Sequence, residues 1–317
     1  MMVTIQSDIT GVLEACGIVT EKPVIITETD DTYPIKANTW DNWFPFAYLA
    51  FEELARKQNI SSFATIGTGN GADAIGAMNI FGRNLETIVL TDIINAALQV
   101  SEQNVKKYSA GKKVDALDGS LCQPLIQRGL KVDLMYENLP NIPDGEWVSS
   151  GYKQASLYNP LLLPAASDKL VRDCLLESHY SLLKEAKYVL NPGGSVICSI
   201  GGRVPNKLLA GMIEGLGYKY GELVAGFKRQ TEPWEVIPGY AKSEKSGIEF
   251  DFYKYDEAVR HFQLIGIRNP FAGLSGDKLK DLLIPYRISA REALKLYEQN
   301  TNYAIGHTVH MIRAINQ

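Results

Sequence analysis

The sequence is poor in the residues that build disulfide frameworks and metal centres. Its four cysteines and four histidines are scattered, with no Cys-x-x-Cys pair and no His-Glu-x-x-His spacing. We therefore expect no disulfide framework and no bound metal, and a reducing compartment such as the cytoplasm. His307 and His310 are expected on a C-terminal helix, at its surface or in the core. The cysteines are Cys16, Cys122, Cys174 and Cys198.

Long apolar runs and concentrated positive charge are also missing. No stretch approaches the roughly 20 apolar residues that a membrane-spanning helix needs, and the first residues lack a basic region followed by an apolar core. The formal net charge is −4, without a cluster of basic residues that would favour a phosphate backbone. We therefore expect no membrane and no nucleic acid as partner, and a small-molecule substrate instead.

A glycine-rich turn is the most informative feature that is present. Residues 63–76 read FATIGTGNGADAIG, an apolar strand-like run followed by Gly67, Gly69, Gly71 and a helix-compatible segment. Closely spaced glycines let a ligand approach the bare backbone. The next predicted strand ends at Asp92, about 20 residues further on, where an acid can accept hydrogen bonds from a ribose. The pattern predicts a site for an adenosine-containing cofactor.

The order of predicted elements indicates an α/β protein. From about residue 61 to 202, short apolar strands alternate with helical patterns, which is typical of a parallel sheet with helices on both faces. The segments Tyr218–Phe227 and Gly247–Tyr255 read as a hairpin added to five parallel strands, giving a mixed seven-stranded sheet. Helical patterns flank this region, and the last segment would pack on the sheet or form a homodimer contact. The expected divisions are a helical cap (1–58), a cofactor-binding domain (59–255) and a helical extension (256–317).

Polar motifs follow the predicted strands of this sheet. Asp118–Gly119 and Asn138–Leu139–Pro140 come after the two strands that follow Asp92, and open α/β sheets bind ligands at such carboxyl ends. The Asn138 amide oxygen and a following backbone carbonyl can accept hydrogen bonds from an amine and orient its lone pair. The alternative is an ordinary turn or capping role, which Asn and Asp often take after strands.

Together these motifs resemble the class I S-adenosylmethionine-dependent methyltransferases over roughly residues 40–255, with LNPGG at 190–194 like the turn before their fifth strand. The resemblance implies their Rossmann-like fold and S-adenosylmethionine as cofactor. It also implies that the glycine turn contacts the methionine and ribose, that Asp92 holds the ribose, and that Asp118 lies near the adenine. The implied cofactor-binding residues outside the aromatic segment are Gly67, Thr68, Gly69, Asn70, Gly71, Asp92, Ile93, Asp118, Gly119, Asn138 and Leu139.

The motif ENLPNIP is similar to the Asn-Pro-Pro-aromatic motif of the amino-directed branch of that family. Leu139 and Asn141 stand where the motif has proline and an aromatic residue. The resemblance implies a nitrogen nucleophile, oriented by Asn138, with Pro140 bordering the substrate. We therefore expect methyl transfer to a small-molecule amine by in-line displacement.

An aromatic segment adds candidates for the cation. Residues 40–46 (WDNWFPF) resemble a segment of plant methionine S-methyltransferases. A sulfonium is attracted to aromatic faces, so Trp43, Phe46, Tyr152 and Tyr158 are candidates to surround it. The two tyrosines join Asn138 as the expected catalytic set. The alternative for Trp43 and Phe46 is packing of an N-terminal helix against the sheet.

Two further predictions concern the substrate side. Gly201–Gly202–Arg203 has a counterpart in the same plant enzymes, and the Arg203 guanidinium can pair with a substrate or cofactor carboxylate. The alternative is a solvated arginine at a helix start. The long segment 144–164 is expected to act as a lid.

The sequence leaves three other functions open. The α-amine of S-adenosylmethionine could attack its own γ-carbon, giving azetidine-2-carboxylate and methylthioadenosine, as in methyltransferase-like cyclases that this sequence resembles. The chain could also bind the cofactor without catalysis, as a scaffold subunit. A nicotinamide oxidoreductase is the remaining competitor, since fold alone does not fix function.

Overall fold

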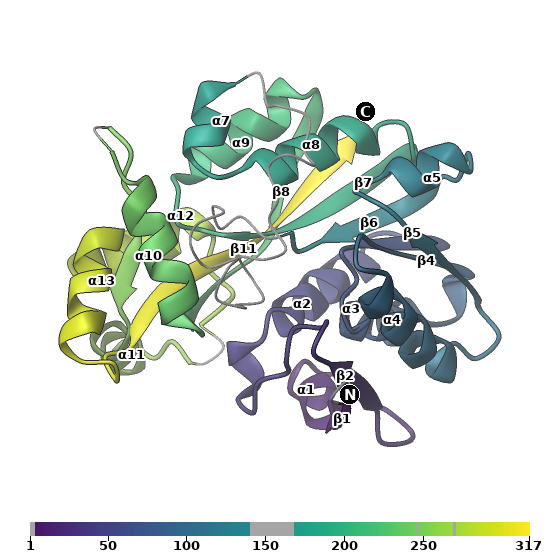
Figure 1. The fold of residues 1–317 in the computed structure, drawn as a ribbon, viewed down its shortest axis with the longest axis horizontal. Coiled ribbons are helices and arrows are strands. Elements are labelled where there is room, and N and C mark those ends of the chain that lie inside the picture. The colour runs from purple at the N-terminus through teal and green to yellow at the C-terminus, as the bar shows by residue number, and fades with distance from the viewer. Residues whose placement is uncertain (1–3, 140–167, 246, 269–270) are drawn as a thin grey trace.

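One mixed sheet of nine strands, two more than expected, runs through the described part of the molecule, with helices on both of its faces (Figure 1). The computed structural model describes residues 4–139, 168–245, 247–268 and 271–317. The strands of the sheet are β3 (Ser62–Ile66), β4 (Thr87–Asp92), β5 (Lys113–Asp118), β6 (Val132–Glu137), β7 (Leu190–Gly201), β8 (Tyr218–Arg229), β9 (Phe252–Lys254), β10 (Arg287–Ile288) and β11 (Ile305–Asn316). Their order is β10-β9-β11-β7-β6-β3-β4-β5, and β8 pairs with β11 outside this row.

The parallel half of the sheet matches the predicted fold class. Strand β3 pairs with β4 and with β6, β4 pairs with β5, and β6 pairs with β7, all in parallel. Their carboxyl ends therefore lie along one edge of the sheet. Strands β3, β4 and β6 are almost continuously buried, as expected for parallel strands covered on both faces.

Two hydrophobic clusters hold the helices on the two faces. One face is covered by α2, α3 and α4, and the other by α5, α8 and α9, with α7 packed on α8. The helices of these layers are α2 (Phe44–Ala55), α3 (Ala72–Phe81) with η2 (Gly82–Asn84), α4 (Asn95–Tyr108), α5 (Gln123–Gln127), α7 (Lys169–Asp173), α8 (Glu177–Ala186) and α9 (Asn206–Gly215). Tyr48 of α2 lies over Gly76 of α3, where any side chain would clash with its ring. This close approach fixes α2 against the helix that follows the glycine turn.

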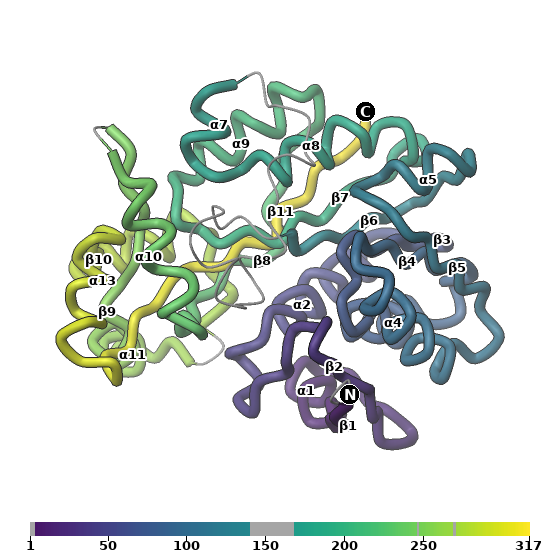
Figure 2. Tube along the Cα trace, in the orientation of Figure 1, coloured from purple at the N-terminus to yellow at the C-terminus, as the bar shows by residue number. Residues whose placement is uncertain are grey.

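The N-terminal segment contains strands as well as the expected helices. Strands β1 (Thr4–Asp8) and β2 (Ile25–Thr29) pair antiparallel around α1 (Thr10–Ala15), and η1 (Thr39–Asp41) precedes α2. Strand β2 passes beside α4 (Figure 2), where the Asn104 side chain accepts from the Thr27 N–H at 2.8 Å and donates to its carbonyl at 2.9 Å. The cap is therefore a small mixed unit tied to α4.

The C-terminal segment also differs from the helical extension expected for it. Its helices are α11 (Tyr255–Leu264), α12 (Gly276–Leu283), η5 (Ile284–Tyr286) and α13 (Ala290–Gln299), and α10 (Pro233–Ser243) precedes it. The last element is strand β11, which lies between β7 and β8 and pairs antiparallel with both. The expected hairpin of 218–227 with 247–255 does not form, because β11 takes the place beside β8. His307 and His310 are buried on this strand and not on a helix.

Candidate cofactor and active site

The glycine turn is tied to the end of β4 through its backbone. The N–H groups of Gly67 and Thr68 both donate to the carbonyl of Thr91, at 2.9 and 3.0 Å. Gly67, Gly69 and Gly71 have φ values of +69°, +54° and +81°, which favour glycine. Space is open above Gly69, since a Cβ added there would meet nothing within 4 Å. The turn thus presents bare backbone at the carboxyl edge of the sheet.

Asp92 links this turn to the neighbouring strand ends. Its carboxylate accepts the Gly69 N–H at 3.0 Å and the Ile94 N–H at 2.9 Å, while its backbone carbonyl accepts the Gly119 N–H at 3.1 Å. Burial raises the pKa of Asp92, backbone hydrogen bonds from Ile94, Gly69 and Ile93 oppose that shift, and nearby Asp118 adds to it. Asp118 lies opposite Asp92 in the β4–β5 register and is exposed. The structure therefore brings these predicted residues together, with Ile93 exposed between the two hydrogen-bonded residues Asp92 and Ile94.

Asn70 has a structural part within the turn. Its side chain accepts the Ala72 N–H at 3.1 Å and donates to the Tyr33 carbonyl at 3.3 Å. Its own carbonyl accepts from Asn104 at 2.9 Å. The same Asn104 side chain holds Thr27, so the turn and the N-terminal strand β2 share one anchor. Order in the cap and in the turn is coupled through that side chain.

Asn138 and Leu139 follow β6 directly beside the turn. A Cβ on Gly67 would stand 3.3 Å from the Leu139 side chain, so the segment after β6 lies against the turn after β3. Asn138 is half-buried. The predicted positions of Asn138, Leu139 and the glycine turn at one edge are thus compatible with a shared ligand. Pro140, Tyr152, Tyr158 and the expected lid 144–164 lie outside the described residues.

The segment Asn138–Leu139 is held by a buried pair of side chains, Glu137 and His179, which the sequence analysis did not predict. His179 of α8 and Glu137 at the end of β6 are both fully buried, and His179 Nδ1 lies 2.7 Å from Glu137 Oε1. The other carboxylate oxygen accepts the Leu139 N–H at 3.0 Å. A fully buried Glu after an apolar strand is costly without partners, and that is the one sequence signal that could have drawn attention to it. The pair fixes the backbone around Asn138.

The aromatic predictions separate into two cases. Phe46 is fully buried in the core, where its ring fills the space beside Gly226 of β8, as the packing alternative describes, and its contact with the cofactor stays a prediction. Trp43 is half-buried, with the Lys228 ammonium 4.8 Å from its ring centre. In this structure the cation over the Trp43 ring is therefore the Lys228 ammonium, at the place where the sulfonium was expected.

Arg203 is buried, which excludes the alternative of a solvated helix-start arginine. It follows β7 at the same carboxyl edge, and its guanidinium lies over the ring of Tyr240 at 4.8 Å. Burial lowers its pKa, while Tyr240 opposes that shift. A buried guanidinium at this edge suits the predicted contact with a carboxylate, which remains a prediction.

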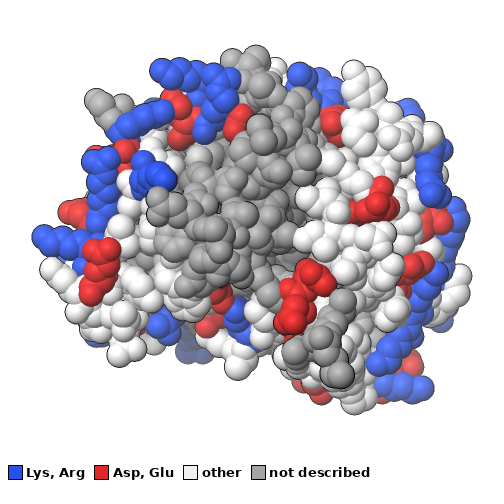
Figure 3. Space-filling model, viewed as in Figure 1, with Lys and Arg blue, Asp and Glu red and all other residues white. Residues whose placement is uncertain are grey.

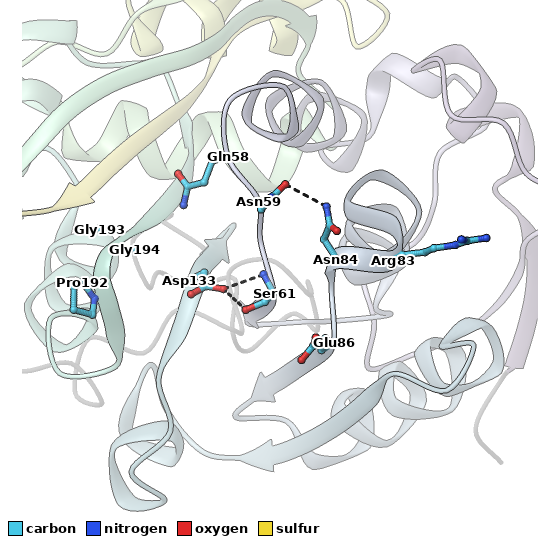
Figure 4. Close-up of a pocket in the computed structure, with 10 residues that line it drawn as sticks. All are labelled: Gln58, Asn59, Ser61, Arg83, Asn84, Glu86, Asp133, Pro192, Gly193 and Gly194. Atoms are coloured by element: carbon cyan, nitrogen blue, oxygen red, sulfur yellow. Dashed lines mark hydrogen bonds between the residues drawn. The ribbon is translucent and has the colours of Figure 1, made fainter.

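A polar hollow of about 420 Å³ lies at the opposite, amino-terminal ends of the strands (Figure 4). Asp133 in its wall accepts from the Ser61 N–H at 2.9 Å, the Ser61 hydroxyl at 2.7 Å and the Asn191 amide at 2.8 Å. These bonds tie β3, β6 and β7 together. The Asp133 carboxylate is thus already used by hydrogen bonds within the protein. The hollow lies far from the edge of the sheet at which Asp92 stands.

The residues at the carboxyl edge fit S-adenosylmethionine. The Thr68 hydroxyl is buried in the glycine turn and has no hydrogen-bond partner in the described structure, as expected where a ligand supplies one. Asp92 keeps acceptor capacity beyond its two backbone donors, since a carboxylate has about four lone-pair sites. The open space above Gly69 lets a ligand lie directly against the backbone of the glycine turn. The fit rests on these three observations.

The chain is similar in sequence to curated bacterial methyltransferases. No protein-family model matches the chain. Among curated proteins, it is 33% identical over 141 residues to the release factor glutamine methyltransferase of Moorella thermoacetica, covering 44% of this chain and 46% of the relative. It is 26% identical over 194 residues to that of Clostridium acetobutylicum, covering 61% and 64%. The match thus spans less than two thirds of the length of each relative.

Solved structures are more distant. The ribosomal protein L11 methylase of Lactobacillus delbrueckii subsp. bulgaricus has a TM-score of 0.39 and 17% identity, covering 62% of this chain and 75% of that chain. A putative methyltransferase of Bacillus halodurans has a TM-score of 0.42 and 10% identity, covering 84% and 97%.

The fold is the Rossmann-like fold of class I methyltransferases, as predicted, and the names of the curated relatives agree with the predicted methyltransferase class, for which S-adenosylmethionine is the methyl donor. The prediction of a small-molecule partner is wrong. The curated relatives are named for glutamine in a release factor, which is a protein and not a small amine. Nothing in the comparisons supports the azetidine-forming reaction. In the described part of the chain, no helix is both long and apolar enough to cross a bilayer.

Proposed function

We propose that this chain is an S-adenosylmethionine-dependent N-methyltransferase whose acceptor is the side-chain amide of a glutamine in a protein, of the release-factor kind. The observation that carries the proposal is the close approach of Leu139 to Gly67, whose added Cβ would stand 3.3 Å from the Leu139 side chain, so that Asn138 follows β6 beside the glycine turn held by Asp92. The names of the curated relatives support the choice of acceptor. Asn138 keeps the amide of the family motif although its neighbours differ.

A primary amide suits this geometry because its nitrogen carries two N–H groups. Both can donate, one to the Asn138 side-chain oxygen and one to a following backbone carbonyl, which fixes the nitrogen in one orientation. An amide nitrogen is a weak nucleophile, so orientation and exclusion of water would supply most of the acceleration. When bound, the cofactor supplies a methyl group already activated by its sulfonium.

Because the cofactor supplies the activated methyl group, the protein residues bind the cofactor and orient the amide. Asp92 would hold the ribose through charge-assisted hydrogen bonds, and the backbone of the glycine turn would lie along the ligand. The Glu137–His179 pair holds the Leu139 N–H and so keeps the Asn138 backbone in place. Transfer of the methyl group would form the N–C bond, break the S–CH3 bond of the cofactor and leave S-adenosylhomocysteine, while the amide nitrogen would lose one proton to solvent.

The test is methylation of a purified bacterial release factor. The protein is incubated with S-adenosylmethionine and the release factor, and tandem mass spectrometry locates any added methyl group. We expect one methyl on a glutamine side chain, lost when that glutamine is replaced by alanine. An unmodified release factor, with a protein that demonstrably binds the cofactor, would overturn the proposal. A parallel incubation without acceptor detects methylthioadenosine, the product of the cyclisation considered above.

A further inference from the structure

Three basic side chains meet inside the protein at the carboxyl edge of the sheet. Arg203 follows β7, Lys228 lies near the end of β8, and His307 lies near the start of β11, directly opposite Lys228 in the register. Their exposed fractions are 3%, 1% and 1%. Strand β11 lies between the other two strands, so the three residues occupy neighbouring positions along one edge.

Trp43 forms one wall of this basic cluster. The Lys228 ammonium is 4.8 Å from the centre of its ring, and the His307 ring is 5.5 Å away, centre to centre. Lys228 also donates to the backbone carbonyls of Asp41 and Asn42, at 2.5 and 3.2 Å. These direct partners are carbonyl dipoles and an aromatic face, and the carboxylates of Asp41 and Glu232 act on the ammonium only through longer-range charge.

The guanidinium of Arg203 is likewise surrounded by neutral groups. It lies 4.8 Å from the Tyr240 ring centre and 5.3 Å from that of Phe252, and it donates to the Tyr240 hydroxyl at 3.5 Å and to Gln230. Its Nε has no hydrogen-bond partner in the part of the chain that the structure describes, although it is buried. A buried charge with an unused donor is costly unless an anion joins it.

The pKa values of Lys228 and His307 also indicate that this cluster lacks a negative partner in direct contact among the described residues. Burial lowers the pKa of His307 well below its usual value, and the charges of Arg203 and Lys228 lower it further. Burial also lowers the pKa of Lys228 to about 7, with Asp41 and Glu232 opposing the shift. An entering anion would favour the charged forms of Lys228 and His307 and so oppose these shifts.

We propose that Arg203, with Lys228 and His307 beside it, binds the carboxylate of a ligand at the carboxyl edge of the sheet. A carboxylate accepts two parallel hydrogen bonds from a guanidinium fork, and the unused Arg203 Nε is one such donor. Two sources carry that group: the α-carboxylate of S-adenosylmethionine, and an acidic side chain of the protein acceptor. Only the second source rests on the proposed function.

Binding measurements separate these sources. S-adenosylhomocysteine carries the α-carboxylate, whereas methylthioadenosine lacks it, so each is titrated calorimetrically into wild-type protein and the Arg203→Gln, Arg203→Lys and Lys228→Met variants. Arg313→Gln is the matched control, because Arg313 is a part-buried arginine on the same strand as His307, bonded to Ser195 and Gln58 at the opposite edge. Thermal unfolding confirms that each variant is folded. Arg203→Lys keeps the charge without the fork if Arg203→Gln does not fold.

If the carboxylate is that of the cofactor, Arg203→Gln weakens S-adenosylhomocysteine binding about tenfold to a hundredfold and leaves methylthioadenosine unchanged. If it belongs to the acceptor, both affinities stay the same and the KM for the release factor rises about tenfold or more, with kcat little changed. Arg313→Gln changes neither. An unchanged affinity ratio together with an unchanged KM would overturn the site. Should wild-type protein fail to methylate the release factor, the proposed function fails, and an unchanged affinity ratio alone would then overturn the site.

Discussion

Glu137 and His179, 42 residues apart in the sequence, form a fully buried pair with 2.7 Å between carboxylate oxygen and ring nitrogen. The second carboxylate oxygen holds the Leu139 N–H. Replacing His179 by alanine leaves a buried carboxylate short of one partner and opens a cavity. We expect a loss of about 2–4 kcal/mol in the free energy of unfolding, measured with urea. Lys184→Ala on the exposed side of the same helix should change it by no more than about 0.5 kcal/mol. Equal effects of the two substitutions would remove the supporting role of the pair.

Asp92→Ala should weaken S-adenosylhomocysteine binding by roughly 1–3 kcal/mol, through lost charge-assisted hydrogen bonds to the ribose. Calorimetric titration measures the change. The control is Asp115→Ala on β5, because that carboxylate pairs with Lys113 at 2.7 Å and lies before the strand end. Unaltered affinity in the Asp92 variant would mean that the ribose is held elsewhere.

Substitutions of glycine distinguish a ligand-facing position from a packing one. Gly69 and Gly111 both have positive φ and open space around an added Cβ, so alanine at either should cost only about 1–2 kcal/mol of stability, from backbone strain. Gly69→Ala alone should also weaken S-adenosylhomocysteine binding, because its methyl group enters the cofactor side. At Gly71 the Cβ would stand 2.9 Å from a Val105 methyl, so Gly71→Ala should lose clearly more stability than either. If Gly69→Ala and Gly111→Ala bind the ligand equally, the turn is not its site.

Lys228 should give the protein a distinctive pH dependence. Its folded-state pKa of about 7 is below the ordinary 10.5, so between these values the unfolded chain binds more protons than the folded one. The stability of the wild type should therefore rise with pH relative to Lys228→Met, by up to about 1.4 kcal/mol per pH unit between pH 7 and 9. Urea unfolding of both proteins at several pH values measures this. Asp41 and Glu232 oppose the shift, while Arg203 and Lys36 favour it, and parallel curves for the two proteins would show that the ammonium is not desolvated.

Asn138→Ala should separate catalysis from cofactor binding. Removing the side-chain acceptor of the glutamine amide should lower kcat on the order of a hundredfold, because a preorganised hydrogen bond at the reacting nitrogen is lost. The affinity for S-adenosylhomocysteine should change little. Single-turnover methylation of the release factor measures the rate. If the variant retains wild-type kcat, Asn138 does not orient the acceptor, and its role is the turn or capping role given above as the alternative.

The parts predicted well from sequence are those fixed by local pattern. The glycine turn, the strand ending at Asp92 and the acid at 118 were readable because backbone conformation and strand ends depend on a few adjacent residues. Alternation of strands and helices likewise specified the parallel half of the sheet and brought Asn138 to the correct edge.

The parts missed depend on contacts between distant segments. Strand β11 is buried on both faces over Ile305–Met311, so it lacks the polar–apolar alternation that marks a half-exposed strand, and it read as helix. The partners of Glu137 and Arg203 come from α8, from Gln230 just after β8 and from α10, which no spacing rule connects to them. Lys228 directly follows the apolar run 223–227 of β8, and this position was a usable signal, because a lysine buried there must be paired or desolvated. Surface charge gave little guidance, since both signs are mixed around the rim of the face in Figure 3.

The central claim is that the carboxyl edge formed by the glycine turn and Asp92 binds S-adenosylmethionine. Calorimetric titration of the purified protein with S-adenosylhomocysteine, and separately with NAD, tests it most directly. The account predicts saturable one-to-one binding of S-adenosylhomocysteine and no binding of NAD. Binding of NAD without binding of S-adenosylhomocysteine would contradict it.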